Sequence, residues 1–170
     1  MTIEYEATFT NVDKDKVRER FRQAGAALIR PEYLQKRIPF YLPKEKRADN
    51  VWLRVRDEGD KITLSLKMVD GDKIENQKEI CLEINSFDDA VELLKAIGCE
   101  QKSYQETRRE LWKLDGVDIT IDEWPFLEPF VEVEGNSEEA VKNVSEKLGF
   151  NYADALFSTA GNLYAMKYNI

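Results

Sequence analysis

The sequence predicts an α+β protein in which one face of an antiparallel β-sheet is apolar and covered by helices, and the other face is polar. Two observations lead to this prediction. Strand-like segments alternate between apolar and polar residues, and helix-like segments carry their apolar residues on one stripe. A chain of 170 residues can bury a real core, so we expect residues 1–170 to form a single domain.

The strand-like segments are the strongest part of this pattern. Because alternate side chains of a strand point to opposite faces, each alternating segment has one apolar and one polar face. Asp115 and Gly116 are a suitable hairpin turn between two of the segments. The expected strands are residues 3–9, 34–41, 51–56, 62–68, 79–84, 104–114, 117–122 and 130–134, with less regular alternation in 34–41 and 104–114.

Three segments have the periodicity of amphipathic helices, namely residues 13–24, 86–97 and 136–148. Ser86 with Asp89, and Asn136 with Glu139, have the spacing of a helix N-terminal cap. Residues 154–168 are predicted to be helical in part. These helices can cover the apolar face of the sheet.

Composition excludes several classes of function. A net charge of −8 argues against binding to nucleic acid or to an anionic membrane. The chain has no His, which removes Ser-His and Cys-His catalysis and the commonest ligand of zinc, so any metal would be held by oxygens, as Mg²⁺, Mn²⁺ and Ca²⁺ are. Without a long apolar run or a signal-peptide pattern, we expect a soluble, cytoplasmic protein.

The polar sheet face carries charges of both signs, and these charges are segregated. Like charges stand two residues apart on three strands, which is a poor choice for stability alone. An open sheet with one solvated face would explain the alternation. If instead the sheet curls and turns this face inward, the charges need a compensating ligand, such as a phosphate chain with Mg²⁺. The acids are Glu4, Glu6, Glu79, Glu83, Asp118, Asp122, Glu132 and Glu134, and the bases are Arg37, Arg54, Arg56, Lys67 and Arg109.

An ordered series of motifs on these strands resembles the CYTH domain, or triphosphate tunnel metalloenzyme, family over essentially the whole chain. The family signature ExExK corresponds to residues 4–8, and its LRxR strand corresponds to residues 53–56. A later lysine corresponds to Lys67, a later arginine to Arg109, and the last acidic segment to residues 122–134. The family includes thiamine triphosphatases, inorganic triphosphatases and class IV adenylyl cyclases.

The resemblance implies a closed antiparallel barrel of about eight strands that forms a polar tunnel, with helices outside. It implies metal-dependent hydrolysis of a small-molecule triphosphate, with Mg²⁺ or Mn²⁺ as cofactor, and no nucleic-acid or membrane partner; assembly into a homodimer stays open. Three groups of residues take roles by this resemblance. They are Glu4, Glu6 and Lys67 for catalysis, Arg37, Arg54, Arg56, Lys67 and Arg109 for phosphate binding, and Glu4, Glu6, Asp122, Glu132 and Glu134 for the metal, although Asp122 could instead orient a basic neighbour.

The chain departs from the family at two positions where a basic residue is replaced. Thr8 stands where the signature has lysine, and Thr107 stands two residues before Arg109, where a basic residue is often found. Both changes remove positive charge near the expected phosphates. Three functions therefore stay open: a triphosphatase, a class IV-type adenylyl cyclase that makes cyclic AMP from ATP, and a module that binds polyphosphate or nucleotide without catalysis.

Overall fold

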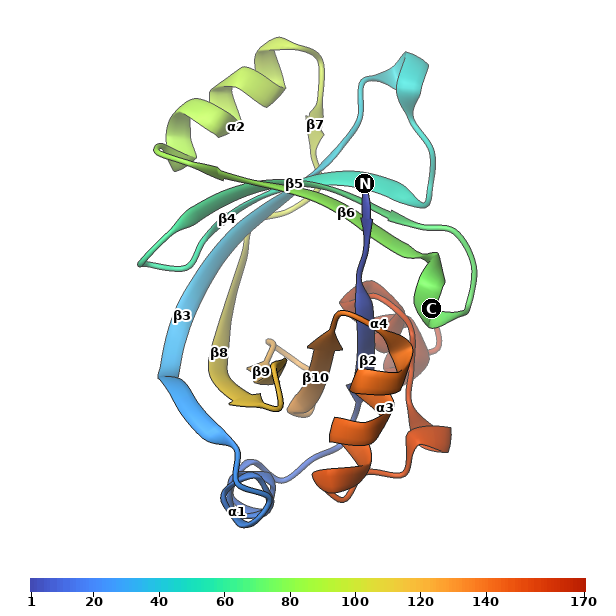
Figure 1. Cartoon of the computed structure of the whole chain (residues 1–170). Coiled ribbons are helices and arrows are strands. Elements are labelled where there is room, and N and C mark those ends of the chain that lie inside the picture. The colour runs from blue at the N-terminus through green and yellow to red at the C-terminus, as the bar shows by residue number, and fades with distance from the viewer.

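The structure, a computed structural model that describes all of residues 1–170, is a nearly closed antiparallel barrel with helices packed outside it (Figure 1). This arrangement confirms the predicted fold class. The strands are β1 (Thr2–Ile3), β2 (Tyr5–Phe9), β3 (Ala27–Tyr41), β4 (Val51–Asp57), β5 (Ile62–Val69), β6 (Gln77–Ile84), β7 (Glu100–Gln101), β8 (Gln105–Leu114), β9 (Val117–Glu123) and β10 (Phe130–Gly135).

The order of the strands explains how the barrel closes. Neighbouring strands follow the order β1-β6-β5-β4-β3-β8-β9-β10-β2, and β7 pairs with β3 beside this path. The two ends of the order, β1 and β2, are consecutive in sequence and are separated only by Glu4. The first strand of the chain therefore joins both ends of the sheet, and Glu4 lies at the junction.

The seam at this junction is held by single contacts instead of a continuous ladder. The backbone N–H of Glu4 donates to the carbonyl of Gln77 at 2.9 Å, and the side-chain amide of Gln77 donates to the carbonyl of Glu6 at 3.0 Å. Farther along β2, Thr8 exchanges two backbone hydrogen bonds of 2.9 Å with Leu156. The segment before the last helix thus covers the part of β2 that β6 does not reach.

The helices begin and end where local sequence signals place them. α1 (Lys14–Gln23) is capped by Asp13, and α2 (Phe87–Ala96) is capped by Ser86, as predicted for the second of these helices. α3 (Glu138–Lys147) is capped by Ser137, whose hydroxyl accepts from the N–H of Ala140, and not by Asn136 as we expected. α4 (Ala160–Tyr168) forms the helical part of the C-terminal segment, and no helix of the chain has the length and apolar character needed to span a membrane.

The hydrophobic core lies outside the barrel, between the strands and the helices. A larger cluster joins the outer faces of β2, β8, β9 and β10 to α1 and α3, with Phe21, Trp112, Ile119 and Val141 at most 2% exposed. A smaller cluster joins β3 and β4 to α2 and contains Phe40, Val55 and Leu94. Because the apolar row of each strand is used on the outside, the polar row is left to line the interior.

The structure corrects three details of the predicted strands. It has ten strands instead of about eight, because the first strand is divided at Glu4 and the two-residue β7 is added. β3 begins at Ala27 instead of residue 34, and its pairing with β8 shifts register between Leu28 and Tyr33, around Pro31. The turn at Asp115 and Gly116 is confirmed, since both residues have positive φ, at 51° and 78°.

Candidate functional site

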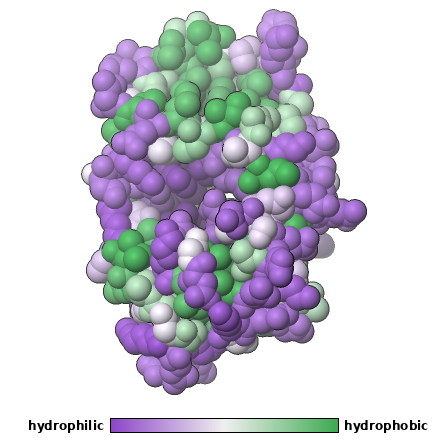
Figure 2. All heavy atoms as spheres, in the orientation of Figure 1, coloured by the Kyte–Doolittle hydropathy of each residue, from purple (hydrophilic) through white to green (hydrophobic).

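Most of the charged residues singled out in the sequence gather inside the barrel, whereas Glu83 and Glu134 are exposed and Asp118 pairs with the exposed Lys113. In Figure 2 the face of the molecule is hollowed near its middle, and hydrophilic residues surround this hollow. The cross-strand register explains the grouping, because residues directly opposite each other point to the same face. Thr8 lies opposite Glu132, Glu6 opposite Glu134, Arg37 opposite Arg56, and Lys67 opposite Glu79.

One wall, formed by β8, β9 and β10, carries a closed set of ion pairs that we call the paired wall. Arg109 donates to both carboxylate oxygens of Asp122, at 2.7 and 3.0 Å, and to Glu132 at 2.6 Å. The Thr120 hydroxyl donates to Asp122 at 2.6 Å. Although burial opposes it, the two carboxylates raise the pKa of Arg109 well above its ordinary value. Asp122 is fully buried, and its contacts match the alternative role expected for it, the orientation of Arg109.

The opposite wall, formed by β3, β4 and β5, is the basic wall, and its hydrogen-bond donors are incompletely used. Arg37, Arg54 and Arg56 each have a buried Nε–H without a hydrogen-bond partner. Arg54 pairs with Glu79 at 3.2 Å and Arg56 with Glu58 at 3.4 Å, whereas Arg37 pairs with no carboxylate. The hydroxyls of Thr63 and Ser65, on the adjoining β5, are buried and unpartnered too.

Burial and the crowding of positive charges lower the pKa values of two arginines on this wall. Burial, followed by the charge of Arg54, lowers the pKa of Arg56 to about 10. Burial and the charges of Arg54 and Arg109 lower the pKa of Arg37 well below its ordinary value. Buried donors without acceptors cost free energy, and an anion between these side chains would satisfy them. The basic wall is therefore built to receive an anion with several oxygens.

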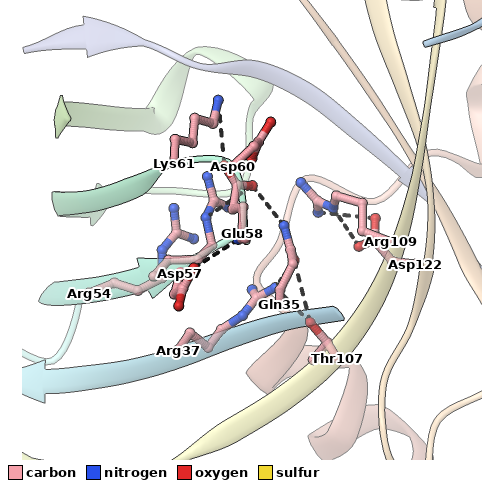
Figure 3. A network of polar contacts seen from close by, with 12 residues as sticks. Gln35, Arg37, Arg54, Asp57, Glu58, Asp60, Lys61, Thr107, Arg109 and Asp122 are labelled. Carbon is pink, nitrogen blue, oxygen red and sulfur yellow. Dashed lines mark hydrogen bonds and ion pairs between the residues drawn. The ribbon is translucent and has the colours of Figure 1, made fainter. Parts of the chain in front are cut away.

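A network of polar side chains holds the arginines of this wall in place (Figure 3). Gln35, which is fully buried, donates to Glu58 at 2.8 Å and accepts from the guanidinium of Arg37. Arg37 also donates to the Thr107 hydroxyl at 2.9 Å. Burial acts to raise the pKa of Glu58, but Arg56 and Lys61 together lower it. The neutral amide of Gln35 thus separates the Glu58 carboxylate from Arg37, whose charge stays uncompensated.

The acids of β2 and β6 form the third part of the interior. Lys67 contacts the Glu4 carboxylate at 2.9 Å. Burial and the nearby Glu79 raise the pKa of Glu4 to about 7, although Lys67 acts to lower it. Burial acts to raise the pKa of Glu79, but its hydrogen bond with Glu4 and the charges of Lys67 and Arg54 lower it to about 2. Of the two neighbouring carboxylates, Glu79 is thus the one that loses its proton more readily.

Glu6 is the carboxylate with the least compensation. It forms no side-chain hydrogen bond and no ion pair, and Glu134 lies directly opposite it on the neighbouring strand. Burial and the charge of Glu132 raise the pKa of Glu6 well above its ordinary value, with smaller contributions from Glu134 and Glu4. Burial and Asp122 likewise raise the pKa of Glu132. A divalent cation would relieve this repulsion.

The oxygen donors present fit a hard divalent cation, although no three acids lie together as a ready cation cage. Glu4 is held by Lys67, and Glu132 by Arg109, while Glu6 is unengaged. Glu134 is exposed at the rim of the interior, opposite Glu6. The residues that could hold Mg²⁺ or Mn²⁺ are therefore Glu4, Glu6, Glu132 and Glu134, with Asp122 committed to Arg109.

Several residues of the site were not predicted from the sequence as functional. Gln35 and Thr107 gave no charge signal, and Glu58 lies in the turn after β4, beyond the alternating residues. Trp124 follows β9, and the Arg37 guanidinium stacks on its ring at 4.5 Å from the centroid. These residues either carry no charge or lie beyond the alternating segments, so the pattern of charges on the strands did not identify them.

Comparisons with known proteins agree with this geometry. The model of the CYTH domain matches residues 4–159. A relative from Methanocaldococcus jannaschii named "putative adenylate cyclase" is 26% identical over 147 residues, which are 85% of this chain and 81% of the relative. The structure of a "putative adenylate cyclase" from Vibrio parahaemolyticus superposes with a TM-score of 0.81 at 14% identity, covering 96% of this chain and 98% of the other. A Hippeastrum protein, described as a "putative adenylyl cyclase" with a dominant triphosphatase activity, superposes with a TM-score of 0.62 at 15% identity, covering 99% and 96%. At these identities the two structures establish the fold.

Proposed function

We propose, from the premise that this chain belongs to the CYTH domain family, that it hydrolyses a small-molecule triphosphate inside the barrel with the help of a divalent cation. The observation that carries the proposal is the basic wall, where the buried Nε–H groups of Arg37 and Arg54 and two buried hydroxyls form no hydrogen bond, and the Nε of Arg56 has only a 3.4 Å contact with Glu58. A chain of phosphates supplies many acceptor oxygens with negative charge. Arginine is suited to bind them through its planar fork of donors.

The residues of the interior have separate tasks in this proposal. Arg37, Arg54, Arg56 and Arg109 hold phosphate oxygens, and Lys67 contributes a point charge between the basic wall and Glu4. Asp122 and Thr120 fix the orientation of Arg109. Glu4, Glu6, Glu132 and Glu134 would hold Mg²⁺ or Mn²⁺. When bound, such an ion supplies neutralisation of phosphate charge and polarisation of water.

The reaction is attack of water on the terminal phosphorus, with cleavage of its bond to the bridging oxygen. Inorganic phosphate and the shortened phosphate chain are the products, and the proton lost by water passes to a carboxylate or to solvent. The positioned arginines stabilise the charge on the equatorial oxygens of the transferred group. Hydrolysis demands less of the site than cyclisation, because water needs no positioned ribose.

A second candidate function is adenylyl cyclase activity, which the name of the Methanocaldococcus jannaschii relative favours. Here the ribose 3′-hydroxyl of ATP would attack the α-phosphorus, and pyrophosphate would leave. The same arginines and acids would serve both reactions. Binding without turnover is the third candidate, and Thr8 and Thr107 are the observation in its favour.

One assay separates the three candidates. The purified protein is incubated with Mg²⁺ or Mn²⁺ and with inorganic triphosphate, thiamine triphosphate or ATP, and the products are separated. We expect phosphate release that stops in excess chelator and in Arg54→Ala/Arg56→Ala, but continues in Lys36→Ala, a matched change at an exposed basic residue of β3. Cyclic AMP would support the cyclase, and absence of any product with retained binding would support the binding module. Undiminished turnover in chelator would contradict the metal requirement.

A further inference from the structure

The outer half of β6 is an uncovered sheet edge. β6 pairs with β5 along its whole length, from Gln77 opposite Val69 to Ile84 opposite Ile62. On its other side, β1 covers only Lys78 and Glu79. In Figure 1, β1 meets β6 near the marked N-terminus, and the part of β6 that leads to α2 lies beside β5 alone. Residues 80–84 therefore end the sheet.

The unused backbone groups of this edge can be identified from the bonds beside it. The carbonyls of Gln77 and Glu79 accept from Glu4 and Thr2 on the β1 side. Because the direction of backbone groups alternates along a strand, the N–H and C=O of Cys81 and Glu83 point to the same side. No hydrogen bond uses them. The edge thus presents two donors and two acceptors in strand geometry.

The side chains of this edge are apolar on the outer face. Ile80 is 41% exposed and Leu82 is 55% exposed, and the segment 80–84 contains neither Lys nor Pro, which commonly protect natural edge strands. Leu93 and Ile97 of α2 are each 57% exposed. Figure 2 shows hydrophobic residues gathered over the upper part of the molecule, where α2 lies above the strands. Exposed apolar surface of this kind marks an interaction site.

We propose that this edge of β6 pairs antiparallel with the same edge of a second copy of the chain, around a two-fold axis at Leu82. In this register Leu82 lies opposite the partner's Leu82, Ile80 opposite the partner's Ile84, and Cys81 opposite the partner's Glu83. Four backbone hydrogen bonds form between Cys81 and Glu83 of the two copies. The outer face of the joined strands is apolar throughout.

Charge selects both the partner and the register. A symmetric edge needs a partner with the same spacing of donors, acceptors and apolar side chains, which a second copy supplies. An axis at Glu83 would place that residue opposite its own copy, and an axis at Cys81 would place Glu83 opposite Glu79. Like charges directly opposite each other destabilise a strand pair. An axis at Leu82 avoids both contacts.

The interface extends beyond one pair of strands. A stable interface buries about 800 Å² on each partner, which a five-residue edge cannot supply alone. α2 follows directly after β6 and packs on the cluster that Ile84 contacts, and in the proposed dimer its exposed Leu93 and Ile97 supply the additional contact area. Charged residues of the interior are not involved, so dimer formation is independent of the proposed catalysis.

The oligomeric state of the full chain tests this proposal. We expect a dimer of the wild-type protein by light scattering during size-exclusion chromatography at about 50 μM, a concentration that detects micromolar affinity. Leu82→Lys should give a folded monomer. Cys81→Pro should do the same, because it removes an edge-facing N–H and leaves the bonds to β5, which use the even-numbered residues. Met166→Lys, a change of a 65% exposed apolar residue on α4, should remain a dimer.

Circular dichroism and melting temperature show whether each variant is folded, so loss of the fold cannot be mistaken for loss of the dimer. A monomeric wild type would overturn the proposal. So would a dimer that survives both Leu82→Lys and Cys81→Pro, since another surface would then form it. If the edge of β6 bound a different protein and not a second copy of the chain, that result would also contradict the proposal.

The register is tested by disulfide formation. In a Cys81→Ser/Cys99→Ser background, Leu82→Cys places two cysteines directly opposite each other, at a Cα separation of about 4.5 Å for a non-hydrogen-bonded pair. We expect a reducible covalent dimer on mild oxidation. Glu83→Cys in the same background should give little of it, because its copies lie diagonally across the axis. Efficient cross-linking of Glu83→Cys with none of Leu82→Cys would overturn the register.

Discussion

The two walls of the barrel interior hold similar side chains but leave them in opposite states. On the paired wall, one arginine pairs with two carboxylates, Asp122 and Glu132. On the basic wall, three arginines share two carboxylates, and each retains an unpartnered Nε–H. Because both walls are largely buried, the difference does not come from solvent. The paired wall is complete within the protein, whereas the basic wall needs an acceptor from outside.

This difference separates residues that are already paired within the protein from residues that are left free to bind, and Arg109, which is proposed to contact phosphate as well, belongs mainly to the first group. A buried ion pair is strongly destabilising to break, because the remaining charge is left without compensation. A buried arginine without a carboxylate contributes little to the fold but has high affinity for an arriving anion. The same substitution should therefore affect stability on one wall and ligand binding on the other.

The largest expected effect is the loss of Arg109. In Arg109→Met, Asp122 and Glu132 remain buried without their cation, so we expect the free energy of unfolding at pH 7 to fall by about 3–5 kcal/mol. Urea denaturation measures it. Arg108→Met, at the exposed neighbouring position, is the control and should change stability little. A loss below about 1 kcal/mol for Arg109→Met would contradict the role of the paired wall.

The matching change on the basic wall is Arg37→Met. Arg37 has no carboxylate partner, so we expect stability to change by no more than about 1 kcal/mol. Affinity for inorganic triphosphate should fall at least about tenfold, which corresponds to one lost charge-assisted hydrogen bond. Calorimetric titration at fixed Mg²⁺ and salt gives the affinity, and Lys36→Met serves as the control. Equal loss of stability in Arg37→Met and Arg109→Met would remove the distinction between the walls.

The sequence predicts which charged residues share one face of the sheet, because the side chains of a strand alternate between its two faces. Alternation assigned Arg54, Arg56, Lys67, Asp122 and Glu132 to one face, because burial of the other face fixes the register of every strand. Alternation alone does not decide whether that face points into a barrel or toward solvent. The outcome depends on closure of the sheet, which the division of the first strand at Glu4 brings about.

The pairing of charges could not be predicted from the sequence. Which carboxylate meets which arginine depends on the register between strands far apart in the chain, as for Arg109 and Glu132. Gln35 carries no charge, and Glu58 lies in a turn, so neither followed a pattern. The first half of β3 was likewise not predicted as a strand, because the register shifts near Pro31 interrupt the alternation of apolar and polar residues.

The acids of β2 should make stability depend on pH in an unusual direction. The pKa of Glu4 is raised to about 7, and the pKa values of Glu6 and Glu132 are raised too. Between pH 4.5 and 7 the folded protein therefore binds more protons than the unfolded chain, and stability falls as pH rises. Glu79, with its pKa lowered to about 2, contributes fully throughout this window and adds no slope.

We therefore expect the free energy of unfolding, measured by urea denaturation in chelator, to fall by about 2 kcal/mol from pH 5 to pH 8. Glu4→Gln/Glu6→Gln should flatten the profile, whereas Glu139→Gln, at an exposed position of α3, should not. Added Mg²⁺ should recover stability at pH 8 more than at pH 5, because it replaces the lost protons. A profile that is level or rises with pH would show that these acids are compensated, in the way that Asp122 is paired with Arg109.

The smallest expected effect concerns Thr8, which lies on β2 beside Glu132 of the paired wall. Thr8 is 2% exposed and lies opposite Glu132 on the inward face, with Glu6 two residues before it. A lysine there would bring a positive charge to an uncompensated carboxylate and to the bound phosphates. At about 4 Å and an effective dielectric constant of about 20, the attraction is roughly 4 kcal/mol before desolvation and entropy are subtracted. We expect a net gain of about 1 kcal/mol, or several-fold in affinity.

Calorimetric titration of inorganic triphosphate into Thr8→Lys, Thr8→Glu and Thr8→Val, beside the wild type, measures this effect. Thr8→Lys should tighten binding and speed any hydrolysis, Thr8→Glu should weaken both, and Thr8→Val, which keeps the shape without charge, should change affinity little. Thr8→Lys should also flatten the pH dependence of stability, because the ammonium group favours ionised Glu6. If Thr8→Lys and Thr8→Glu bind triphosphate equally, charge at this position does not act on the ligand. The phosphates then lie nearer the basic wall, away from β2.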